Sequence, residues 1–309
     1  MREAPDTEDS RREIRLVLQT EGSHAVARAA ALVGELGLAA LAPDLVAAFD
    51  RFLVNPVRSD PGCSAKTAIV SALRRLEHDA GAVFRRGAEH VQMEPVFGGR
   101  VDTAVDLRGA SALAVAEHGG SDVLVLLARL LADPEPPVRV SAARAVSVHG
   151  AEAGIPLLHL KALSGDGEPR VVSECLLALL RLDPKGALPF VASFLDKDDA
   201  TAEAAAVALG ESRQPEALPT LAAWLPRASR RGLARVALLA VAALRREDAI
   251  EFLLSVVKGE PAATAREALS ALATLGPGDA LVERLTSAVE GRPELRQACA
   301  TLARRPKGL

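Results

Sequence analysis

The chain has 309 residues, of which 49% are hydrophobic and only 3% are aromatic, and it contains no tyrosine. The formal net charge of −3 excludes a strong overall positive field of the kind that draws a protein to nucleic acid or to an anionic membrane. Alanine and leucine, the strongest helix formers, are abundant, so the composition predicts an all-α protein.

The three cysteines, Cys63, Cys175 and Cys299, lie far apart and form no Cys-x-x-Cys pair. This spacing is typical of buried thiols in a reducing compartment and not of a disulfide framework or a zinc site. The amino-terminal residues lack the apolar segment of a signal peptide, and the longest run without a charge, residues 268–278, is too short to cross a bilayer. We therefore expect a cytoplasmic protein that does not enter a membrane.

The first part of the chain, residues 11–120, is expected to form irregular helical pairs after a flexible amino terminus of residues 1–10. Apolar periodicity predicts helices over residues 11–18, 25–36, 45–53 and 65–76. Gly37 is placed to end the second of these helices in a left-handed cap. Residues 55–62 contain two prolines and a glycine, which predicts a loop.

A third pair, with helices near residues 82–90 and 103–117, is interrupted by an inserted loop at residues 91–108 in which no strand pattern is evident. Long irregular loops in compact proteins are usually functional or disordered, and apolar anchors among mixed charges are typical of a partner-binding loop. The candidate binding residues of this loop are Met93, Glu94, Phe97, Arg100, Asp102 and Arg108. The alternative is that Val91, Met93 and Val96 fold back as a local lid.

From residue 121 a unit of about thirty residues recurs, and the short segments that open its first helices lie at positions 125, 156, 189, 219, 251 and 282, in steps of 31, 33, 30, 32 and 31. A fixed period in this range is typical of a solenoid, in which no unit buries its apolar face alone. The sequence therefore predicts a right-handed α-solenoid of about eight stacked helical pairs, with regular repeats over 121–305 continuous with the first part. Gly150, Gly210 and Gly276 are expected to be left-handed helix caps.

The segment from Asp133 to Val146 resembles the second half of a HEAT repeat of the short type also called PBS-lyase HEAT-like, with an aspartate in the turn, then Val-Arg, then paired alanines. Asp166 with Arg170 repeats this pattern, and Glu260 with Arg266 repeats it more loosely. The resemblance implies the fold. It does not imply one function, because such arrays serve scaffolds, transport factors, enzyme subunits and enzymes.

The recurring aspartates and arginines form a predicted structural ladder, whose members are Asp133, Arg139, Asp166, Arg170 and Arg266. Each arginine is expected to pair with a turn aspartate of its own or a neighbouring unit through charge-assisted hydrogen bonds. The alternative is a basic ladder on the concave face that holds an acidic partner. Pairing better explains why the two residue types recur together.

Residues 217–246 contain several arginines and no acidic residue. Arg227, Arg231 and Arg235 are four residues apart, so they would form a stripe if one helix carried all three, and a phosphate-bearing partner could bind there. Pro226 and Ser229 favour a later helix start, which would leave Arg227 in a turn. Arg231 and Arg235 are the candidate binding residues of this stretch.

No catalytic or metal-ligand pattern emerges from the sequence, so we expect no catalytic residue, no metal and no cofactor. The six histidines lack metal spacing. His118 and His149 each precede a glycine at a predicted helix end, where the imidazole can contact unpaired carbonyl groups. Trp224 follows Phe194 by thirty residues, in the equivalent repeat position, and is expected in the core.

These observations favour a non-enzymatic scaffold that binds a protein or peptide on the concave face of the solenoid, with the loop at 91–108 as a further contact. The alternative is nucleic-acid binding, including chemistry like that of the HEAT-like alkylpurine glycosylases. The few aromatic residues and the negative charge disfavour it. A third reading is a role like that of the bilin lyases that share the repeat, or of an enzyme subunit.

Overall fold

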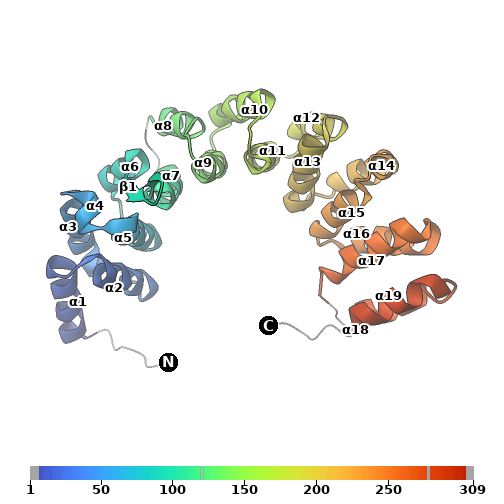
Figure 1. Ribbon diagram of the computed structural model, residues 1–309, viewed down its shortest axis with the longest axis horizontal. Coiled ribbons are helices and arrows are strands. Elements are labelled where there is room, and N and C mark those ends of the chain that lie inside the picture. Colours follow the sequence, from blue (N-terminus) through green and yellow to red (C-terminus); the bar gives the residue numbers. More distant parts are fainter. Residues whose placement is uncertain (1–6, 119, 121, 277–278, 304–309) are drawn as a thin grey trace. The chain divides into compact units, whose positions relative to one another are not determined.

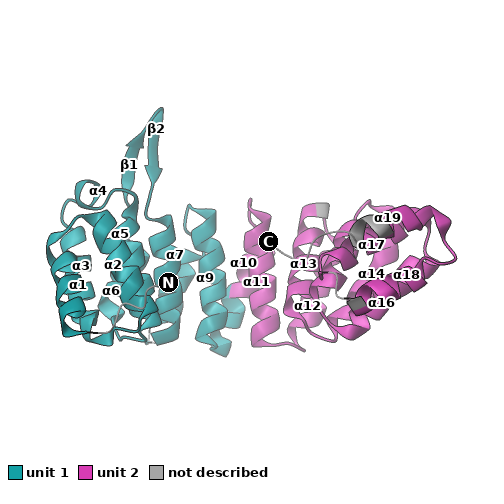
Figure 2. Ribbon diagram, turned by 90° about the horizontal axis from the view of Figure 1, so that it is seen from below, with its two compact units in different colours: residues 1–157 teal, residues 158–309 magenta. Residues whose placement is uncertain are grey.

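Helices form nearly all of the secondary structure in the computed structural model, which describes residues 7–118, 120, 122–276 and 279–303 (Figure 1). The chain divides into two compact units, residues 1–157 and 158–309 (Figure 2). The boundary falls within helix α10. None of the described helices is both long and apolar enough to cross a membrane.

In the first unit, successive helical pairs stack on one another. Its helices are α1 (Glu8–Thr20), α2 (Ser23–Glu35), α3 (Ala42–Phe52), α4 (Pro56–Ser59), α5 (Ser64–Arg75), α6 (Gly81–Glu89), α7 (Val105–His118), α8 (Val123–Leu130) and α9 (Pro136–His149). The second helices of the pairs, α2, α5, α7 and α9, pack side by side, and the first helices cover them on one side (Figure 1). The short helix α4 is additional to these pairs.

The second unit repeats the same two-layer arrangement. Its helices are α10 (Ile155–Ser164), α11 (Pro169–Leu182), α12 (Ala187–Ser193), α13 (Asp199–Ser212), α14 (Ala217–Arg230), α15 (Ala234–Ala243), α16 (Glu247–Gly259), α17 (Ala262–Ala273), α18 (Asp279–Ala288) and α19 (Pro293–Ala303). Helices α11, α13, α15, α17 and α19 pack in succession. The stacking of helical pairs predicted from the repeat is therefore confirmed within each unit, and the described residues contain nine pairs against the eight or so expected.

The core consists mainly of alanine, leucine and valine side chains on the facing sides of these helices. Small residues let neighbouring helices approach closely, and a stack of this kind buries a continuous apolar seam. Trp224 and Phe194 both lie in the core, as expected from their equivalent repeat positions. All three cysteines are buried free thiols, which confirms that part of the prediction.

The three glycines expected as helix caps have two different roles. Gly150, with a φ of 73°, is the left-handed cap of α9, as predicted, and Gly276, with a φ of 83°, is left-handed two residues after Thr274, the cap of α17. Gly210 lies inside α13, and the prediction of a cap there is wrong. A Cβ atom at position 210 would lie 2.5 Å from the carbonyl oxygen of Ala240, so glycine is needed for the close packing of α13 on α15.

The prediction of a flexible amino terminus over residues 1–10 is wrong from Glu8 onward, where helix α1 begins. Residues 1–6 of the expected flexible segment lie outside the described residues. Helix α1 begins at Glu8, with the hydroxyl group of Thr7 accepting a hydrogen bond from the backbone N–H of Ser10. This N-cap starts the helix three residues before the expected position.

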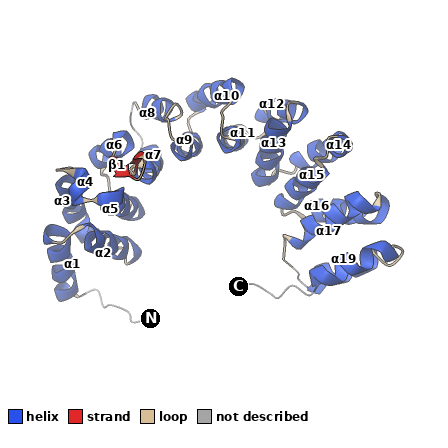
Figure 3. Ribbon diagram, viewed as in Figure 1, coloured by secondary structure: helices blue, strands red, loops and turns tan. Residues whose placement is uncertain are grey.

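The expectation of an irregular loop without strands at residues 91–108 is wrong, because this segment contains a β-hairpin. Strands β1 (Met93–Val96) and β2 (Gly99–Asp102) are antiparallel, with Val96 opposite Gly99 and Met93 opposite Asp102 (Figure 3). Gly98, with a φ of 85°, makes the tight turn. Four residues in each strand are too few to produce a clear period-two signal in a single sequence.

Candidate functional site

The β-hairpin of residues 93–102 projects beyond the ends of the helices in the first unit (Figure 2). Its side chains alternate between two faces, so Glu94, Val96 and Val101 share one face while Met93 and Asp102 share the other. The two carboxylates near the open end of the hairpin therefore point to opposite sides. Each of them is held by a different set of hydrogen bonds.

On the first face, Glu94 joins the hairpin to the segment before α5. Its carboxylate accepts hydrogen bonds from the backbone N–H of Gly62 at 2.7 Å, the side-chain amide of Gln92 at 2.6 Å and the hydroxyl group of Thr103 at 2.7 Å. Burial alone would raise the pKa of Glu94, but these hydrogen bonds outweigh it and lower the pKa below its ordinary value. Glu94 thus stays ionised and ties strand β1 to a loop about thirty residues earlier in the chain.

On the second face, Asp102 is held by the main chain and by Arg108. Its carboxylate accepts from the backbone N–H groups of Ala104 at 2.9 Å and Gln92 at 3.1 Å, and from Arg108 at 2.7 Å. Burial would raise the pKa of Asp102, and the hydrogen bonds from Ala104, Gln92 and Arg108 lower it below its ordinary value. Strand β2 is therefore fixed directly to helix α7.

Arg108 is almost completely buried and has three partners. Besides Asp102, it binds both carboxylate oxygens of Asp133 at 2.9 and 3.1 Å and the backbone carbonyl oxygen of His90 at 3.0 Å. Burial opposes its charge, but the two carboxylates raise the pKa of Arg108 above its ordinary value. The sequence predicts Arg108 as a binding residue. The structure places it in the interior, between the hairpin and the turn before α9.

Three further buried polar residues support the hairpin, and sequence reasoning missed all of them: Asp60, Lys66 and Gln92. The carboxylate of Asp60 lies 3.0 Å from the ammonium group of Lys66 and accepts from the backbone N–H groups of Ala65 and Lys66. Gln92 donates to the carbonyl oxygen of Asp60 at 2.9 Å. The only sequence signal is an aspartate shortly before a helix start, which is typical of a cap.

The far end of the hairpin is apolar and exposed. Phe97, in the turn, is fully accessible to solvent. The exposed large apolar side chains of this segment are Val91, Met93, Val96, Phe97 and Val101. The alternative that Val91, Met93 and Val96 form a local lid is therefore wrong. Arg100 lies on the exposed part of β2, where its guanidinium group donates to the carbonyl oxygen of Met93 at 3.0 Å.

The predicted candidates of this segment thus fall into two groups. Glu94, Asp102 and Arg108 fix the base of the hairpin through internal hydrogen bonds. Met93, Phe97 and Arg100 are exposed, Met93 opposite Asp102 at the base and the other two beyond it. A sequence pattern of mixed charges and apolar residues does not separate these groups, because the separation depends on the strand register.

The predicted Asp–Arg ladder has members that connect neighbouring repeats. Asp133 is bound by Arg108 from the preceding repeat, and Arg139 donates to the backbone carbonyl oxygens of Asp133 and Pro134 at 2.8 and 2.9 Å. Arg266 reaches the carbonyl oxygen of Glu294 in the next repeat at 3.5 Å.

The second aspartate of the ladder, Asp166, lies 2.8 Å from the ammonium group of Lys161. The backbone N–H of Arg170 donates to the carboxylate of Glu168, which caps the start of α11.

The predicted basic stripe of Arg227, Arg231 and Arg235 is not formed. Helix α14 continues through Pro226 to Arg230, Arg231 ends it, and Arg235 belongs to α15 after a turn at Gly232. Arg227 lies 3.1 Å from Asp196, and Arg231 donates to the carbonyl oxygens of Leu195 and Lys197 at 3.0 and 2.7 Å. Arg235 is exposed.

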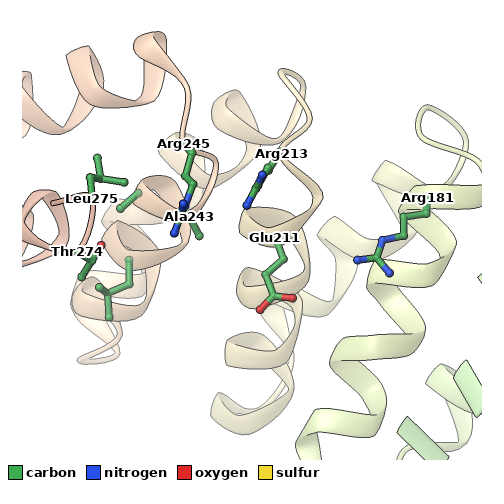
Figure 4. Close-up of a pocket in the computed structure, with 9 residues that line it drawn as sticks. Arg181, Glu211, Arg213, Ala243, Arg245, Thr274 and Leu275 are labelled. Carbon is green, nitrogen blue, oxygen red and sulfur yellow. The ribbon is translucent and has the colours of Figure 1, made fainter. Parts of the chain in front are cut away.

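A second candidate site is a cavity of about 580 Å³ in the second unit, at the carboxyl-terminal ends of α11, α13, α15 and α17 (Figure 4). Its charged lining residues are Arg181, Glu211, Arg213 and Arg245. Figure 4 shows the three arginines on successive segments of the chain, with Glu211 on the same segment as Arg213. Arg245 belongs to the arginine-rich stretch of residues 217–246, but no sequence pattern above predicts Arg181 or Arg213, although the three arginines are 32 residues apart.

The histidines at helix ends have the expected structural role. The Nδ1 atom of His118 lies 2.8 Å from the carbonyl oxygen of Ala114, and that of His149 lies 3.3 Å from the carbonyl oxygen of Ala116. In the part of the chain that the structure describes, no group of three or more His, Cys, Asp or Glu residues is arranged to hold a metal ion.

Comparison with known proteins identifies the repeat. The family model of HEAT repeats matches residues 159–242, and no curated protein sequence matches the chain. Human deoxyhypusine hydroxylase in complex with glycerol is a similar solved structure, with 19% identity over 87% of this chain and 97% of that chain, and a TM-score of 0.35.

The complex of CpcE and CpcF of phycocyanin lyase from Nostoc sp. PCC7120 is a second similar solved structure, with 16% identity over 98% of this chain and 96% of that chain, and a TM-score of 0.35. The HEAT resemblance inferred from the sequence is confirmed by the family model. The match to the family model of HEAT repeats covers residues 159–242 of the 309.

Proposed function

We propose that this protein is a non-enzymatic protein-binding scaffold whose docking element is the exposed end of the β-hairpin. The observation that supports this proposal most strongly is the contrast along the hairpin. Its base is held on both faces by Glu94 and Asp102, while Phe97 is fully exposed in the turn. The inner face of the repeat array stays a further predicted binding surface.

An exposed phenylalanine on a fixed support is suited to binding a protein partner. Aromatic side chains that fill a pocket on a partner are frequent binding hot spots, and a held backbone lowers the ordering cost of association. Val96 and Val101 share one face of the hairpin and widen the apolar surface below Phe97. The expected partner surface is therefore an apolar pocket.

The positive charge of Arg100 indicates which charge we expect on the partner next to its apolar pocket. Its guanidinium group lies on the opposite face from Val96 and is bound to a carbonyl oxygen of its own hairpin, without a carboxylate partner among the described residues. A carboxylate on the partner would pair with it through a charge-assisted hydrogen bond. The proposed partner thus presents an apolar pocket with an acidic edge.

The experiment compares the wild-type chain with the Phe97→Ala variant in quantitative affinity capture from native extract treated with nuclease. We expect one protein to be retained in stoichiometric amount by the wild type and to bind the variant roughly 30-fold more weakly, as for a hot-spot aromatic residue of about 2 kcal/mol. The affinity is then measured with that purified partner.

Val125→Ala provides the matched control, because Val125 is also an exposed apolar residue of the first unit but lies on α8. This variant should bind the partner as the wild type does. Equal retention of every captured protein by the wild type and by Phe97→Ala would remove the hairpin from the proposal.

The structure offers less support for nucleic-acid binding by the arginine-rich segment. Arg227 and Arg231 have partners within the second unit, as an ion pair with Asp196 and hydrogen bonds to backbone carbonyl groups. The bilin-lyase and enzyme-subunit roles stay predictions from the repeat resemblance.

A further inference from the structure

The cavity in the second unit is lined by one arginine from each of three successive repeats. Arg181 is in the last turn of α11, Arg213 follows α13, and Arg245 follows α15. All three are exposed, and the steps between them are 32 residues each. With Glu211 as the fourth charged residue, the cavity carries two net positive charges, although the chain as a whole is negative.

Two of these arginines lack a partner within the described chain. Neither Arg213 nor Arg245 forms a hydrogen bond or an ion pair through its side chain with another described residue. Arg181 lies 3.7 Å from Glu174, at the edge of an ion pair. The guanidinium groups are therefore available to bind anionic groups of another molecule.

The backbone at Arg213 and Arg245 is unusual for arginine. Both residues have left-handed φ angles, 53° and 51°, at the point where the second helix of the repeat ends. The corresponding helix ends in two other repeats carry Gly150 and Gly276, for which this conformation is unstrained. The favourable interaction of a positive charge with the carboxyl end of a helix does not explain arginine at these two positions. A cation in the last helical turn has the same interaction without a left-handed backbone. Arginine at these strained positions is explained if its side chain binds a ligand.

We infer that this cavity, defined by Arg181, Arg213 and Arg245, binds an extended acidic segment of a protein. The inference is independent of the hairpin, which lies in the first unit. The carboxylates of the bound segment would pair with the three guanidinium groups in turn. Apolar side chains of the same cavity, Leu239 and Leu275, would contact the segment between its charges.

The distance between repeats favours an extended peptide over a compact anion. Neighbouring packed helices are about 8–10 Å apart, so the outer two of three arginines at equivalent positions are about 16–20 Å apart, too far for all three to converge on one phosphate group. An extended chain in the polyproline II conformation has three residues per turn and rises about 3.1 Å per residue, so acidic residues at every third position lie on one side and recur at about 9 Å. Glu211 lines the same cavity two residues before Arg213, and its negative charge disfavours an unbroken row of phosphates, as in a nucleic acid.

The test is fluorescence anisotropy with a labelled twelve-residue peptide designed to carry glutamate at every third position and serine or glycine elsewhere. A peptide of the same composition with its glutamates adjacent, and a single-stranded oligonucleotide of similar charge, are the comparison probes. We expect the spaced peptide to bind the full chain at low salt at least about tenfold more tightly than either comparison probe.

The decisive variant is Arg213→Gly combined with Arg245→Gly. Glycine removes the charges and also suits the left-handed backbone, so lost binding cannot be attributed to unfolding. The spaced peptide should bind this variant at least about tenfold more weakly, while Arg235→Ala, which removes an exposed arginine outside the cavity, should bind within about twofold of the wild type.

Unchanged binding by the double variant would overturn the inference, as would equal binding of the two peptides. Tighter binding of the oligonucleotide, lost in the same variant, would replace the acidic peptide with a nucleic acid. Phe97→Ala should leave binding of the spaced peptide unchanged, so the failure of this inference and the failure of the hairpin proposal are separate outcomes.

Discussion

The guanidinium group of Arg108 binds both carboxylate oxygens of Asp133, which lies 25 residues further along the chain in the turn before the next second helix. Arg108 also holds Asp102 at the end of strand β2. One buried side chain thus connects the hairpin, its own repeat and the following repeat. The register of the stack and the orientation of the hairpin therefore depend on the same ion pairs.

Replacement of Arg108 by alanine should strongly destabilise the first unit. Breaking a buried ion pair leaves an uncompensated charge, and here two carboxylates would lose their partner, so we expect a loss of about 3–5 kcal/mol in the free energy of unfolding. Urea denaturation followed by circular dichroism measures it. Arg100→Ala, at an exposed position, should change this free energy by less than about 0.5 kcal/mol. A similar small loss for both variants would contradict the role given to Arg108.

The hairpin base should make the protein sensitive to acid. The pKa values of Glu94 and Asp102 lie below the ordinary values of 4.5 and 3.8, so the folded state binds their protons less readily than the unfolded state does. The stability that they contribute is fully present above those ordinary values and is lost as the pH falls through the lower pKa values of the folded state.

The check is a series of melting temperatures between about pH 2 and pH 7 for the wild type, Glu94→Gln and Asp102→Asn. Each variant should be less stable at pH 7 and should lose less stability on acidification than the wild type does. Parallel curves for all three proteins would show that these two carboxylates do not cause the acid sensitivity.

Glycine at position 213 or 245 should stabilise the second unit. A left-handed conformation costs a residue other than glycine of the order of 1 kcal/mol, and glycine relieves most of that cost. Arg213→Gly and Arg245→Gly should each raise the midpoint of thermal unfolding. The reverse change, Gly150→Arg, should lower it in the first unit, and a lower midpoint for Arg213→Gly would show that its side chain contributes to folding.

Gly210 should not tolerate even one added methyl group. The Cβ atom of alanine would lie 2.5 Å from the carbonyl oxygen and 2.9 Å from the Cα atom of Ala240, and a backbone atom has little room to move. We expect Gly210→Ala to cost about 1–3 kcal/mol, as overpacking in a helix contact does. Gly259→Ala, at a site with no atom within 4 Å, should be neutral or slightly stabilising, and equal effects of the two changes would contradict the packing argument.

The cysteines should be inert in the folded protein. Burial raises the pKa of Cys63 to about 11 and that of Cys175 to about 12, so at pH 8 a thiol with a pKa of 11 is ionised in only about one molecule in a thousand. Iodoacetamide at pH 8 should label neither residue until the chain is unfolded in urea, as read by peptide mass spectrometry. Rapid labelling of native Cys63 would show that the hairpin base opens.

The helical repeat could be predicted because its evidence is local and recurs. Periodic apolar residues at positions such as 125, 156 and 189 predict the first helices of successive pairs, and glycines such as Gly150 predict their ends. Gly210 shows the limit of such reasoning. Its neighbour, Ala240, is thirty residues away, and only the packed structure shows why a side chain is excluded there.

The candidate sites were less predictable because they depend on contacts distant in the sequence. The turn glycines after Phe97 are a weak hairpin signal, but nothing local shows that Glu94 will bind the backbone at Gly62. The stripe at Arg227, Arg231 and Arg235 failed for the same reason, since a turn at Gly232 separates Arg235 from the other two. The arginines at 181, 213 and 245 share a period with the repeat, and that period was a usable signal.

The hydrogen bonds on both faces of the hairpin have a consequence for the kinetics of recognition. A segment that must order itself during an encounter loses conformational entropy in that step, and many collisions end before it is in place. Glu94 and Asp102 make that ordering part of folding instead. A partner of the kind proposed above would therefore meet Phe97 in one fixed orientation on every approach, and the lifetime of the complex would depend on how well its pocket fits one ring.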